Sequence, residues 1–335
     1  MSQSMTSRFH LRRKAIQVDP EKLVSQCPLV CTEKPGIKIS AMLSNLSLSD
    51  WLTNNRERFD QLIDEHGAVL LRGFKPVLVR EFNALIQSID GTPLEYRNRS
   101  TPRSELSKGV FTSTDYPKEE FIPHHNEMAY TRSWPKRLYF NCVIEPGRDG
   151  QTPIADSANV YDRLSPELRF RFEQHGVMYV RNYRPGMDLS WKQVFQTEDK
   201  AEVSRYCNAH GIEYEWLSED WLRTRQRCQA SIRHRVHKRK LWFNQAHLFH
   251  VSNLPSSTQE ELMTSFTEDE LPRNAYFGNG EAIPRSDLDQ IREAYADEEI
   301  AFDWQCGDVF IIDNEAVTHA RRPFEQPRQV VVAMT

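Results

Sequence analysis

Long hydrophobic runs are absent from this sequence. The longest ones, such as residues 309–312 and 330–334, are only a few residues long, whereas a helix that spans a bilayer needs about 20 apolar residues. Short runs of this kind are typical of buried strands. The N-terminal residues are partly basic but include no apolar segment of the kind found in secretory signals. We therefore predict a soluble, cytoplasmic protein without a membrane partner.

An excess of one charge is also absent. The 43 Lys and Arg residues nearly balance the 47 Asp and Glu residues, which leaves a net charge of −4. Because both signs are interspersed, no general polybasic face is expected of the kind that binds phosphate backbones or anionic lipid. This composition argues against nucleic acid as a partner.

Paired cysteines and repeats are scarce as well. Only Cys27 and Cys31, of six cysteines, lie close together, and structural zinc requires a second pair. We therefore interpret them as ordinary thiols. No period of 20 to 50 residues recurs, which excludes solenoids and propellers.

What is present is a mixture of amphipathic helices and apolar strands. Helices are predicted where apolar residues recur at helical spacing between capping residues and glycine stops. Strands are predicted where β-branched and aromatic residues cluster between turn signals. The predicted helices are residues 47–67, 78–89, 165–176, 256–266 and 285–299, and the predicted strands are residues 68–74, 137–145, 241–245, 302–313 and 329–334.

Strands at both ends of a helical stretch favour one α+β domain, with a sheet sandwich or barrel and helices packed outside it. A length of 335 residues permits two average domains, but one large barrel domain also fits. We predict a poorly defined N-terminal extension over residues 1–40 and a single domain over 41–335. A helical insertion is expected at about residues 185–300.

The most specific local motif is His125-Asn126-Glu127. Residues two apart project from the same face of an extended strand, so His125 and Glu127 are expected to converge. His319, which follows a second apolar strand and its Asp313-Asn314 break, is the candidate for a third ligand. Two histidines and one carboxylate form the facial triad that leaves open positions on iron(II).

The other histidines fit structural roles better. His124 alternates away from His125, and His247 and His250 are three apart, which places them on opposite faces of a strand. His175 and His210 each precede a glycine at a predicted helix end, where imidazole favours the helix dipole. The arginines that follow the third ligand, Arg321, Arg322 and Arg328, are expected to place positive charge beside the metal, where an anionic co-substrate can bind.

Four separated motifs carry a resemblance to a known family. They are IPHHNEMAY at 122–130, GQTP at 150–153, WFNQ at 242–245 and GDVFIIDNEAVTHARRPFEQPRQVVVAM at 307–334. In this order and spacing they resemble the taurine dioxygenase-like (TauD/TfdA) family of iron(II)- and 2-oxoglutarate-dependent oxygenases. The sequence is most similar to the branch of amino-acid hydroxylases of natural-product gene clusters, including the aspartyl hydroxylase-like enzymes of syringomycin type. The resemblance covers roughly residues 60 to 335.

The resemblance implies a double-stranded β-helix (jelly-roll) core and a role for five residues. His125, Glu127 and His319 match the iron ligands of the family. Thr152 matches the threonine that hydrogen-bonds a carboxylate of 2-oxoglutarate, and Arg328 matches the arginine that binds the distal carboxylate of this co-substrate. A guanidinium suits that role because its planar fork binds a carboxylate in a bidentate way.

The implied activity is hydroxylation of an unactivated C–H bond, with oxygen and 2-oxoglutarate as co-substrates. The implied substrate is an amino acid or an amino-acid-derived small molecule, either free or tethered to a carrier protein. Glu127 argues against halogenation, because related halogenases replace this carboxylate with a small residue so that chloride can bind iron. Desaturation or cyclisation by the same chemistry is the alternative.

Two hypotheses from other classes stay open at this point. A zinc-dependent hydrolase also uses histidines, an acid and a water, but it does not need Thr152 and Arg328. A non-catalytic jelly-roll binding module predicts no iron binding.

Two features depart from the family pattern. Ala320 stands where the family branch commonly has glycine. The basic run at residues 233–240, RHRVHKRK, is interpreted as a solvated loop or as a docking patch for an acidic carrier protein or an anionic substrate.

Overall fold

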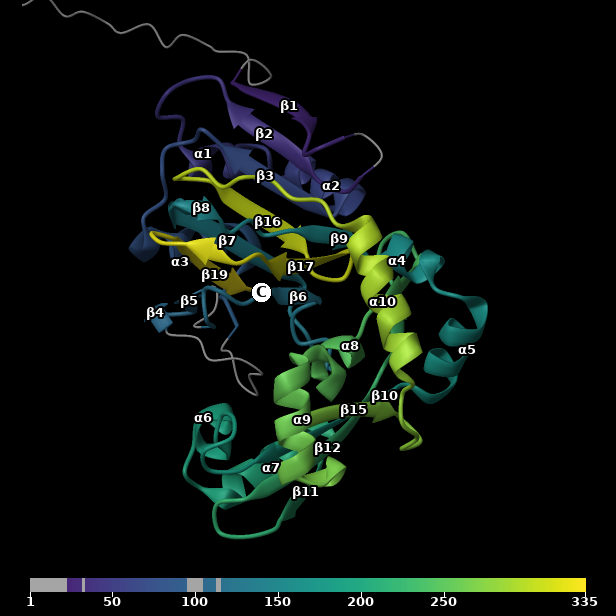
Figure 1. Cartoon of the computed structure of the whole chain (residues 1–335). Helices are drawn as coiled ribbons and strands as arrows, with labels where there is room; N and C mark the ends of the chain where they lie inside the picture. The colour runs from purple at the N-terminus through teal and green to yellow at the C-terminus, as the bar shows by residue number, and fades with distance from the viewer. Residues whose placement is uncertain (1–22, 32–33, 95–104, 113–115) are drawn as a thin grey trace, which may run out of the picture.

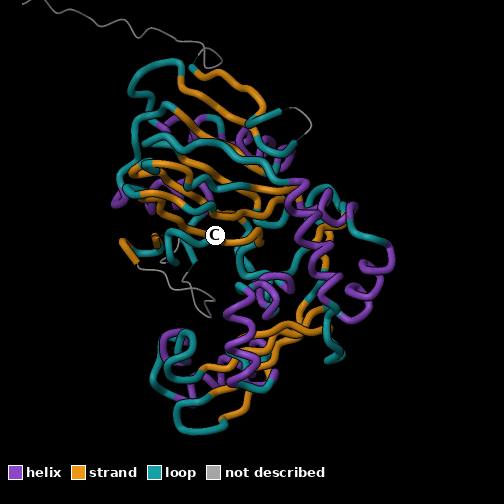
Figure 2. The backbone as a smooth tube through the Cα atoms, in the orientation of Figure 1, coloured by secondary structure: helices purple, strands orange, loops and turns teal. Residues whose placement is uncertain are grey.

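The fold mixes helices and sheets, as the sequence predicts. The computed structural model describes residues 23–31, 34–94, 105–112 and 116–335. Figure 1 shows an upper body built around a large sheet and a lower body built around a smaller one, with helix α10 running beside both. Strands make up the centre of each body, and helices lie around and between them (Figure 2). The α+β class is therefore confirmed.

The upper body centres on an eight-stranded sheet, which is antiparallel except where β2 pairs with β3. In spatial order its strands are β1 (Val24–Pro28), β2 (Ile37–Ala41), β3 (Ala68–Arg72), β16 (Val309–Asp313), β7 (Arg137–Ile144), β19 (Gln329–Met334), β5 (Val110–Thr112) and β4 (Glu105–Ser107). Three helices pack on one face of this sheet: α1 (Leu48–Asn54), α2 (Arg56–His66) and α3 (Val79–Asp90).

Both faces of the large sheet are buried, which explains the continuous apolar runs in the sequence. In β16, Val309 and Ile311 pack among the residues of α1 to α3, whereas Phe310 and Ile312 pack on the opposite face. Successive side chains of a strand point to opposite sides, so a strand covered on both faces has no polar alternation. Short apolar runs of this kind therefore mark the centre of the sheet.

Three shorter strands cover the second face and carry the candidate site. They are β6 (Ile122–His125), β17 (Val317–Arg321) and β9 (Ile154–Asp156), in the order β6-β17-β9. Ile154 and Val317 belong to the same apolar cluster as Phe310. This cluster therefore fills the space between the two sheets. A two-stranded ladder of β18 (Phe324–Glu325) and β8 (Arg148–Asp149) accompanies them.

The prediction of a poorly defined extension over residues 1–40 needs a correction. Residues 1–22 lie outside the described part of the chain, but β1 and β2 belong to the large sheet. Ile37 and Ile39 are almost fully buried in its core. Burial of these side chains holds the two strands in place, and residues 37–40 alternate apolar and polar residues in the way that predicts a strand.

The predicted helical insertion also needs a correction, because it contains a sheet. Helices α4 (Ser157–Arg163) and α5 (Pro166–His175) lead into the lower body. Its four-stranded sheet has the order β11 (Glu213–Trp216), β12 (Leu222–Cys228), β10 (Val177–Tyr183) and β15 (Arg273–Phe277). A hairpin of β13 (Ser231–Arg233) and β14 (Lys240–Trp242) follows β12. The helices here are α6 (Trp191–Phe195), α7 (Lys200–His210), α8 (Ala246–Phe249), α9 (Ser256–Ser265) and α10 (Arg285–Glu298), with short 3₁₀ turns at Val251–Asn253 and Glu268–Glu270.

Local signals placed most helix ends correctly. Ser47 and Ser165 cap helices through their side chains, and Gly67 ends α2 with a left-handed φ of 72°. The helix predicted over 47–67 is broken in two at Asn55, whose side chain donates to the carbonyl of Trp51. Asparagine competes for backbone hydrogen bonds in this way, which favours a break over a continuous helix.

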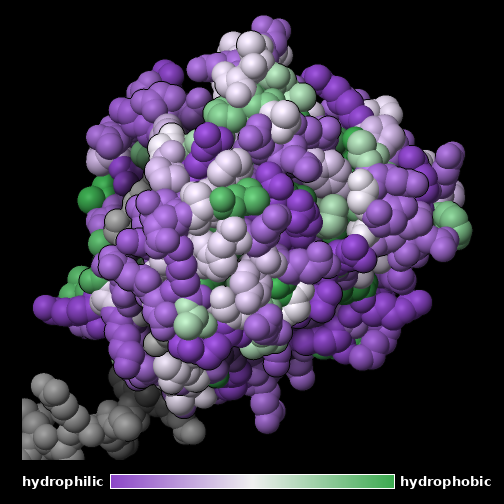
Figure 3. All heavy atoms as spheres, turned by 90° about the horizontal axis from the view of Figure 1, so that it is seen from below, coloured by the Kyte–Doolittle hydropathy of each residue, from purple (hydrophilic) through white to green (hydrophobic). Residues whose placement is uncertain are grey.

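The surface agrees with the composition. The face seen from below is predominantly hydrophilic, with hydrophobic residues scattered over it (Figure 3). Among the described residues, none of the helices is both long enough and apolar enough to traverse a bilayer.

Candidate metal centre

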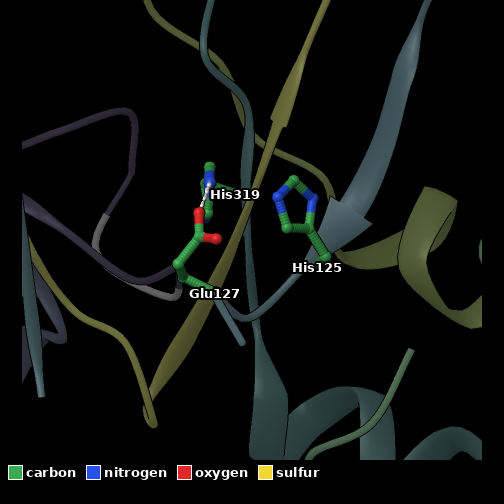
Figure 4. Close-up of side chains that lie close together, drawn as sticks. All are labelled: His125, Glu127 and His319. Carbon is green, nitrogen blue, oxygen red and sulfur yellow. Dashed lines mark ion pairs between the residues drawn. The ribbon is translucent and has the colours of Figure 1, made fainter. Parts of the chain in front are cut away.

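The structure brings together the three residues that the sequence singled out. His125 is the last residue of β6, Glu127 lies two residues further on, and His319 lies in the middle of β17. His125 and His319 are register partners across the two strands, with ring centroids 4.2 Å apart. Nε2 of His319 lies 4.0 Å from Oε2 of Glu127. One ligand atom from each of the three residues lies within 4.8 Å of the other two, and the side chains converge in Figure 4.

Hydrogen bonds orient this group. Nδ1 of His125 bonds the carbonyl of Pro123 at 2.8 Å, which directs Nε2 toward the centre. The N–H of Glu127 donates to Oδ1 of Asn314 at 2.7 Å, and Nδ2 of Asn314 donates back to the carbonyl of Glu127 at 3.0 Å. Asn126 in turn donates to the carbonyl of Asn314 at 2.7 Å. The two buried asparagines therefore fix the backbone that carries the Glu127 carboxylate.

The fit to a metal ion follows from the donor set. Glu127 and His319 are 2 % and 6 % exposed, so the carboxylate is almost entirely removed from water. A buried carboxylate needs a compensating positive charge. Two imidazoles and one carboxylate on one side of a centre suit a ferrous ion and leave the other side for small ligands.

A cavity of about 800 Å³ opens onto this centre. His125 and Glu127 form part of its wall, and the opposite wall comes from the lower body, including Phe249 of α8 and Arg273 of β15. Gln245, from the WFNQ motif, also lines it and donates to the carbonyl of Asn126 at 2.7 Å. The strand predicted over 241–245 ends at Trp242, which leaves Gln245 in the loop between β14 and α8. The insertion therefore contributes part of the wall of this cavity.

Thr152 and Arg328 share a neighbourhood beside β9. The Arg328 guanidinium donates to the carbonyl of Gly150 at 3.0 Å, two residues before Thr152. The indole N–H of Trp304 donates to the hydroxyl oxygen of Thr152 at 3.1 Å, which leaves the hydroxyl proton to point elsewhere. Ile154, two residues after Thr152, is the register partner of His319. Burial, reinforced by nearby Arg321, lowers the pKa of Arg328 to about 10, and a buried cation of this kind favours an anionic ligand.

The other two arginines of this segment have different partners. Arg321 donates to the backbone carbonyls of residues 116, 117 and 120. Arg322 forms an ion pair with Glu299 at 2.5 Å. Glu299 therefore compensates the charge of Arg322. Arg321 bonds only neutral carbonyls among the contacts described and lies close enough to Arg328 to lower its pKa, so the expectation that its charge helps to bind a co-substrate stays a prediction. Ala320 fits within β17, where its N–H donates to the carbonyl of Pro153 at 2.9 Å.

The remaining histidines lie outside the metal cluster. His247 and His250 occupy α8 and its C-terminal end rather than a strand. Burial lowers the pKa of His247 to about 3 and that of His250 to about 4, so both are neutral at pH 7. His175 and His210 are each the last residue of a helix, next to a glycine, as predicted. His124 points away from the centre and bonds Thr318 and Glu299.

A second cluster of metal-ligand residue types was missed by the sequence analysis. His234, Asp313 and Glu315 are buried and bring their ligand atoms within 4.8 Å of one another. The Arg235 guanidinium already lies between the two carboxylates, 2.5 Å from Asp313 and 3.3 Å from Glu315. This cluster is therefore a buried ion-pair network rather than a metal site.

The network also explains the basic run. Besides Arg235, Lys240 pairs with Glu173 and Arg239 with Asp162. The basic run thus joins the β13–β14 hairpin to the rest of the fold through ion pairs, and the interpretation as a solvated loop is incomplete.

The fold and the centre define a class: a mononuclear metal enzyme with a two-histidine, one-carboxylate site. The model of the taurine catabolism dioxygenase TauD, TfdA family matches residues 32–335. The chain belongs to this family and is an iron(II)- and 2-oxoglutarate-dependent oxygenase. The hypotheses of a zinc hydrolase and of a non-catalytic module do not agree with this membership.

Individual relatives agree with the family. The chain is 39 % identical over 307 residues to the dapdiamide synthesis protein DdaC of Enterobacter agglomerans, covering 92 % of this chain and 93 % of the relative. It is 33 % identical over 298 residues to a clavaminate synthase-like protein of Arabidopsis thaliana, covering 84 % and 86 %. Among solved structures, PvcB of Pseudomonas aeruginosa matches with a TM-score of 0.56 at 14 % identity, covering 97 % and 94 %. That last likeness concerns the fold alone.

Proposed function

We propose that this oxygenase hydroxylates an unactivated C–H bond of an amino acid or an amino-acid-derived small molecule in specialised metabolism. His125, Glu127 and His319 are the proposed iron ligands, and Thr152 and Arg328 the proposed 2-oxoglutarate ligands. The observation that carries the proposal is the convergence of the three ligand residues, two of which, His125 and Glu127, line one large cavity.

The eight-stranded and three-stranded sheets are the proposed walls of a double-stranded β-helix (jelly-roll) core. Their shared apolar cluster, which includes Phe310 and Val317, supports this arrangement. The TauD-like neighbours support it as well. Two of the proposed metal ligands, His125 and His319, lie on neighbouring strands of the smaller wall, β6 and β17.

In this proposal one group of residues binds the metal and another group binds the co-substrate. Bound iron(II) supplies oxidation of the substrate by O2, coupled to conversion of 2-oxoglutarate to succinate and CO2. The proposed role of Thr152 is to donate its hydroxyl proton to a carboxylate of the co-substrate, which is supported by the bond that its oxygen accepts from Trp304. The Arg328 guanidinium supplies a buried positive charge near it. Glu127 keeps a carboxylate in the ligand set, which favours hydroxylation over halogenation.

The cavity supports an amino-acid substrate. Its wall holds one close pair of opposite charges: Arg273 of β15 lies 2.5 Å from Asp188. Both side chains are about a quarter exposed, at 27 % and 23 %. An ammonium and a carboxylate on one small molecule complement such a pair. The remaining lining is largely apolar, with Phe249, Leu254 and Leu262 among its members.

The relatives support a place in specialised metabolism. The similar protein DdaC is named for dapdiamide synthesis, and another relative, 23 % identical, is named as an isocyanoethenyl-indole synthase of Fischerella ambigua. Both names describe biosynthesis of small nitrogen-containing compounds. By similarity we assign this chain to the same kind of pathway.

A mass-spectrometric screen tests the proposed reaction. Free amino acids and carrier-bound aminoacyl groups are incubated with the enzyme, iron(II), 2-oxoglutarate and O2. A gain of one oxygen supports hydroxylation, and a loss of two hydrogens indicates the alternative, desaturation or cyclisation. The His319→Ala variant is the negative control. Succinate formation that no amino-acid-derived compound stimulates would argue against the proposed substrate class.

Substitution of Arg328 tests the co-substrate site. We expect Arg328→Ala to retain metal binding but to raise the KM for 2-oxoglutarate by about 10- to 100-fold, since a charge-assisted hydrogen bond contributes about 1.5–3 kcal/mol. Titration calorimetry of 2-oxoglutarate with the Mn(II)-loaded protein measures the same loss without turnover. An Arg148→Ala variant, which removes an exposed arginine of β8, is the control.

Substitution of Arg273 tests recognition of the substrate. We expect Arg273→Leu to raise the KM for a free amino-acid substrate by roughly 10- to 100-fold, with a smaller change in kcat and none in the affinity for 2-oxoglutarate. Arg285→Leu removes a more exposed arginine, also paired to an aspartate, and serves as control. An unchanged KM in Arg273→Leu would show that this pair does not bind the substrate carboxylate.

A further inference from the structure

The two ligand histidines are held by a short and irregular ladder. Strand β6 has four residues, and its register with β17 consists of His319↔His125 and Arg321↔Ile122 with a shift between them. A one-residue slip turns a ligand side chain to the opposite face of a strand. Backbone pairing over so short a stretch gives little protection against such a slip.

A pair of side chains on the reverse face joins the same two strands. His124 and Thr318 immediately precede His125 and His319, so they point away from the metal centre. Nδ1 of His124 lies 3.1 Å from the hydroxyl of Thr318. Both residues are buried, at 4 % and 0 % exposed. This hydrogen bond therefore lies directly behind the ligand pair.

The contacts of His124 extend to two helices, α10 and α8. Nε2 of His124 bonds Oε2 of Glu299, the residue after α10, at 2.9 Å. His247 of α8 bonds the backbone carbonyl of His124 at 2.9 Å. Tyr295 of α10 stacks on the His124 ring with an interplanar angle of 10°. The contacts with Glu299 and Tyr295 therefore fix the orientation of the imidazole independently of its bond to Thr318.

We infer that the His124–Thr318 hydrogen bond is a register lock, which sets the relative position of the two histidine ligands. The inference rests on the proposed function, because it takes His125 and His319 as the metal ligands. Both residues are positioning residues, since they act on the metal through their neighbours in sequence. Without this bond, β6 and β17 can shift relative to each other, which moves the two histidine ligands out of the positions that metal binding requires.

Replacement of the Thr318 hydroxyl tests the lock. Thr318→Val keeps the branched shape and removes the hydroxyl, whereas Thr318→Ser keeps the hydroxyl. We expect the affinity for Mn(II), measured by electron paramagnetic resonance, to fall about 10- to 100-fold in Thr318→Val, the range found for groups that orient metal ligands. The Co(II)-loaded variant should show an altered ligand-field spectrum. Thr318→Ser should retain the wild-type values.

Two further variants make the result decisive. His124→Phe keeps a ring beside Tyr295 but removes the hydrogen bonds to Thr318 and Glu299. The double variant with Thr318→Val should lose no more affinity than His124→Phe alone, because the bond between residues 124 and 318 is already absent in the single variant. Thr224→Val removes a buried hydroxyl from the other sheet and should leave Mn(II) affinity unchanged.

The outcomes separate the lock from the site itself. Loss of Mn(II) binding in His319→Ala, with wild-type affinity in folded Thr318→Val, would overturn the lock and keep the proposed metal centre. Wild-type Mn(II) affinity in His319→Ala would overturn the assignment of His319 as a metal ligand, and the lock would fall with it. Equal losses in Thr318→Val and Thr318→Ser would also overturn the lock, since the hydroxyl would then make no difference. Should Thr318→Val not fold, His124→Phe alone gives the test, and wild-type Mn(II) affinity in the folded His124→Phe variant would overturn the lock.

Discussion

Replacement of His319 by alanine is expected to abolish iron(II) binding and turnover. The side chain is 6 % exposed and faces His125 and Glu127, so its loss removes one of three proposed ligands and leaves a space that bulk water reaches poorly. The effect on metal affinity should exceed the roughly 10- to 100-fold typical for removal of a supporting hydrogen bond. His125→Ala should behave in the same way.

The measurement is metal content after anaerobic reconstitution, followed by an assay of O2-dependent succinate formation. His210→Ala is a suitable control, because His210 is exposed at the end of α7 and its ring lies against Tyr206, one turn away on the same helix, whose carbonyl it bonds. Normal iron content and turnover in either ligand variant would refute the ligand assignment.

Replacement of Arg235 by alanine is expected to lower the free energy of unfolding by about 3–5 kcal/mol, the range for breaking a buried ion pair. Asp313 is fully buried, at 0 % exposed, and Arg235 contacts both of its carboxylate oxygens. Removal of the guanidinium leaves this carboxylate with its charge only partly compensated by His234. Chemical denaturation at pH 7 measures the loss.

The loss of stability in Arg235→Ala is expected to depend on pH. Burial by itself raises the pKa of Asp313, but hydrogen bonds from His234 and Arg235 outweigh it and lower the pKa to about 2. A carboxyl with a depressed pKa stabilises the fold above its unfolded pKa, near 4, and this contribution disappears as the pH falls toward 2. The stability deficit of Arg235→Ala should therefore shrink as the pH is lowered from 7 toward 3.

An exposed ion pair in the same basic run provides the control. Arg239 and Asp162 are 51 % and 63 % exposed in their side chains, and such pairs contribute less than about 1 kcal/mol. Arg239→Ala should therefore leave the stability nearly unchanged. A deficit in Arg235→Ala that stays constant between pH 7 and 3 would contradict the assignment to Asp313.

Asp313 also connects the fold to the site. It is the last residue of β16, and the next residue, Asn314, bonds both backbone polar groups of Glu127. Partial loss of order at this corner is therefore expected to weaken metal binding as well as stability. A joint fall in both quantities in Arg235→Ala distinguishes this corner from a remote ion pair.

The sequence by itself determined the local features of this protein. Apolar runs identified the central strands of the large sheet, and Ser47, Gly67, Ser165 and Gly176 marked helix ends, because caps and stops depend on neighbouring residues alone. The spacing of His125 and Glu127 identified two members of the metal cluster, since residues two apart on a strand face the same way. His319 was the candidate for the third ligand because it follows a second apolar strand, and the resemblance to the family agreed with it.

Tertiary structure decided the rest, because the partners are far apart in the chain. Asn314 reaches Glu127 across 187 positions, and Thr318 reaches His124 across 194. Nothing in the sequence near Arg235 indicates that its partner is Asp313, 78 residues away. The insertion's place opposite the metal centre, which gives the cavity its second wall, likewise follows from packing of whole elements. Local spacing determines which side chains lie on the same face of a strand, whereas the pairing of strands determines which distant residues contact that face.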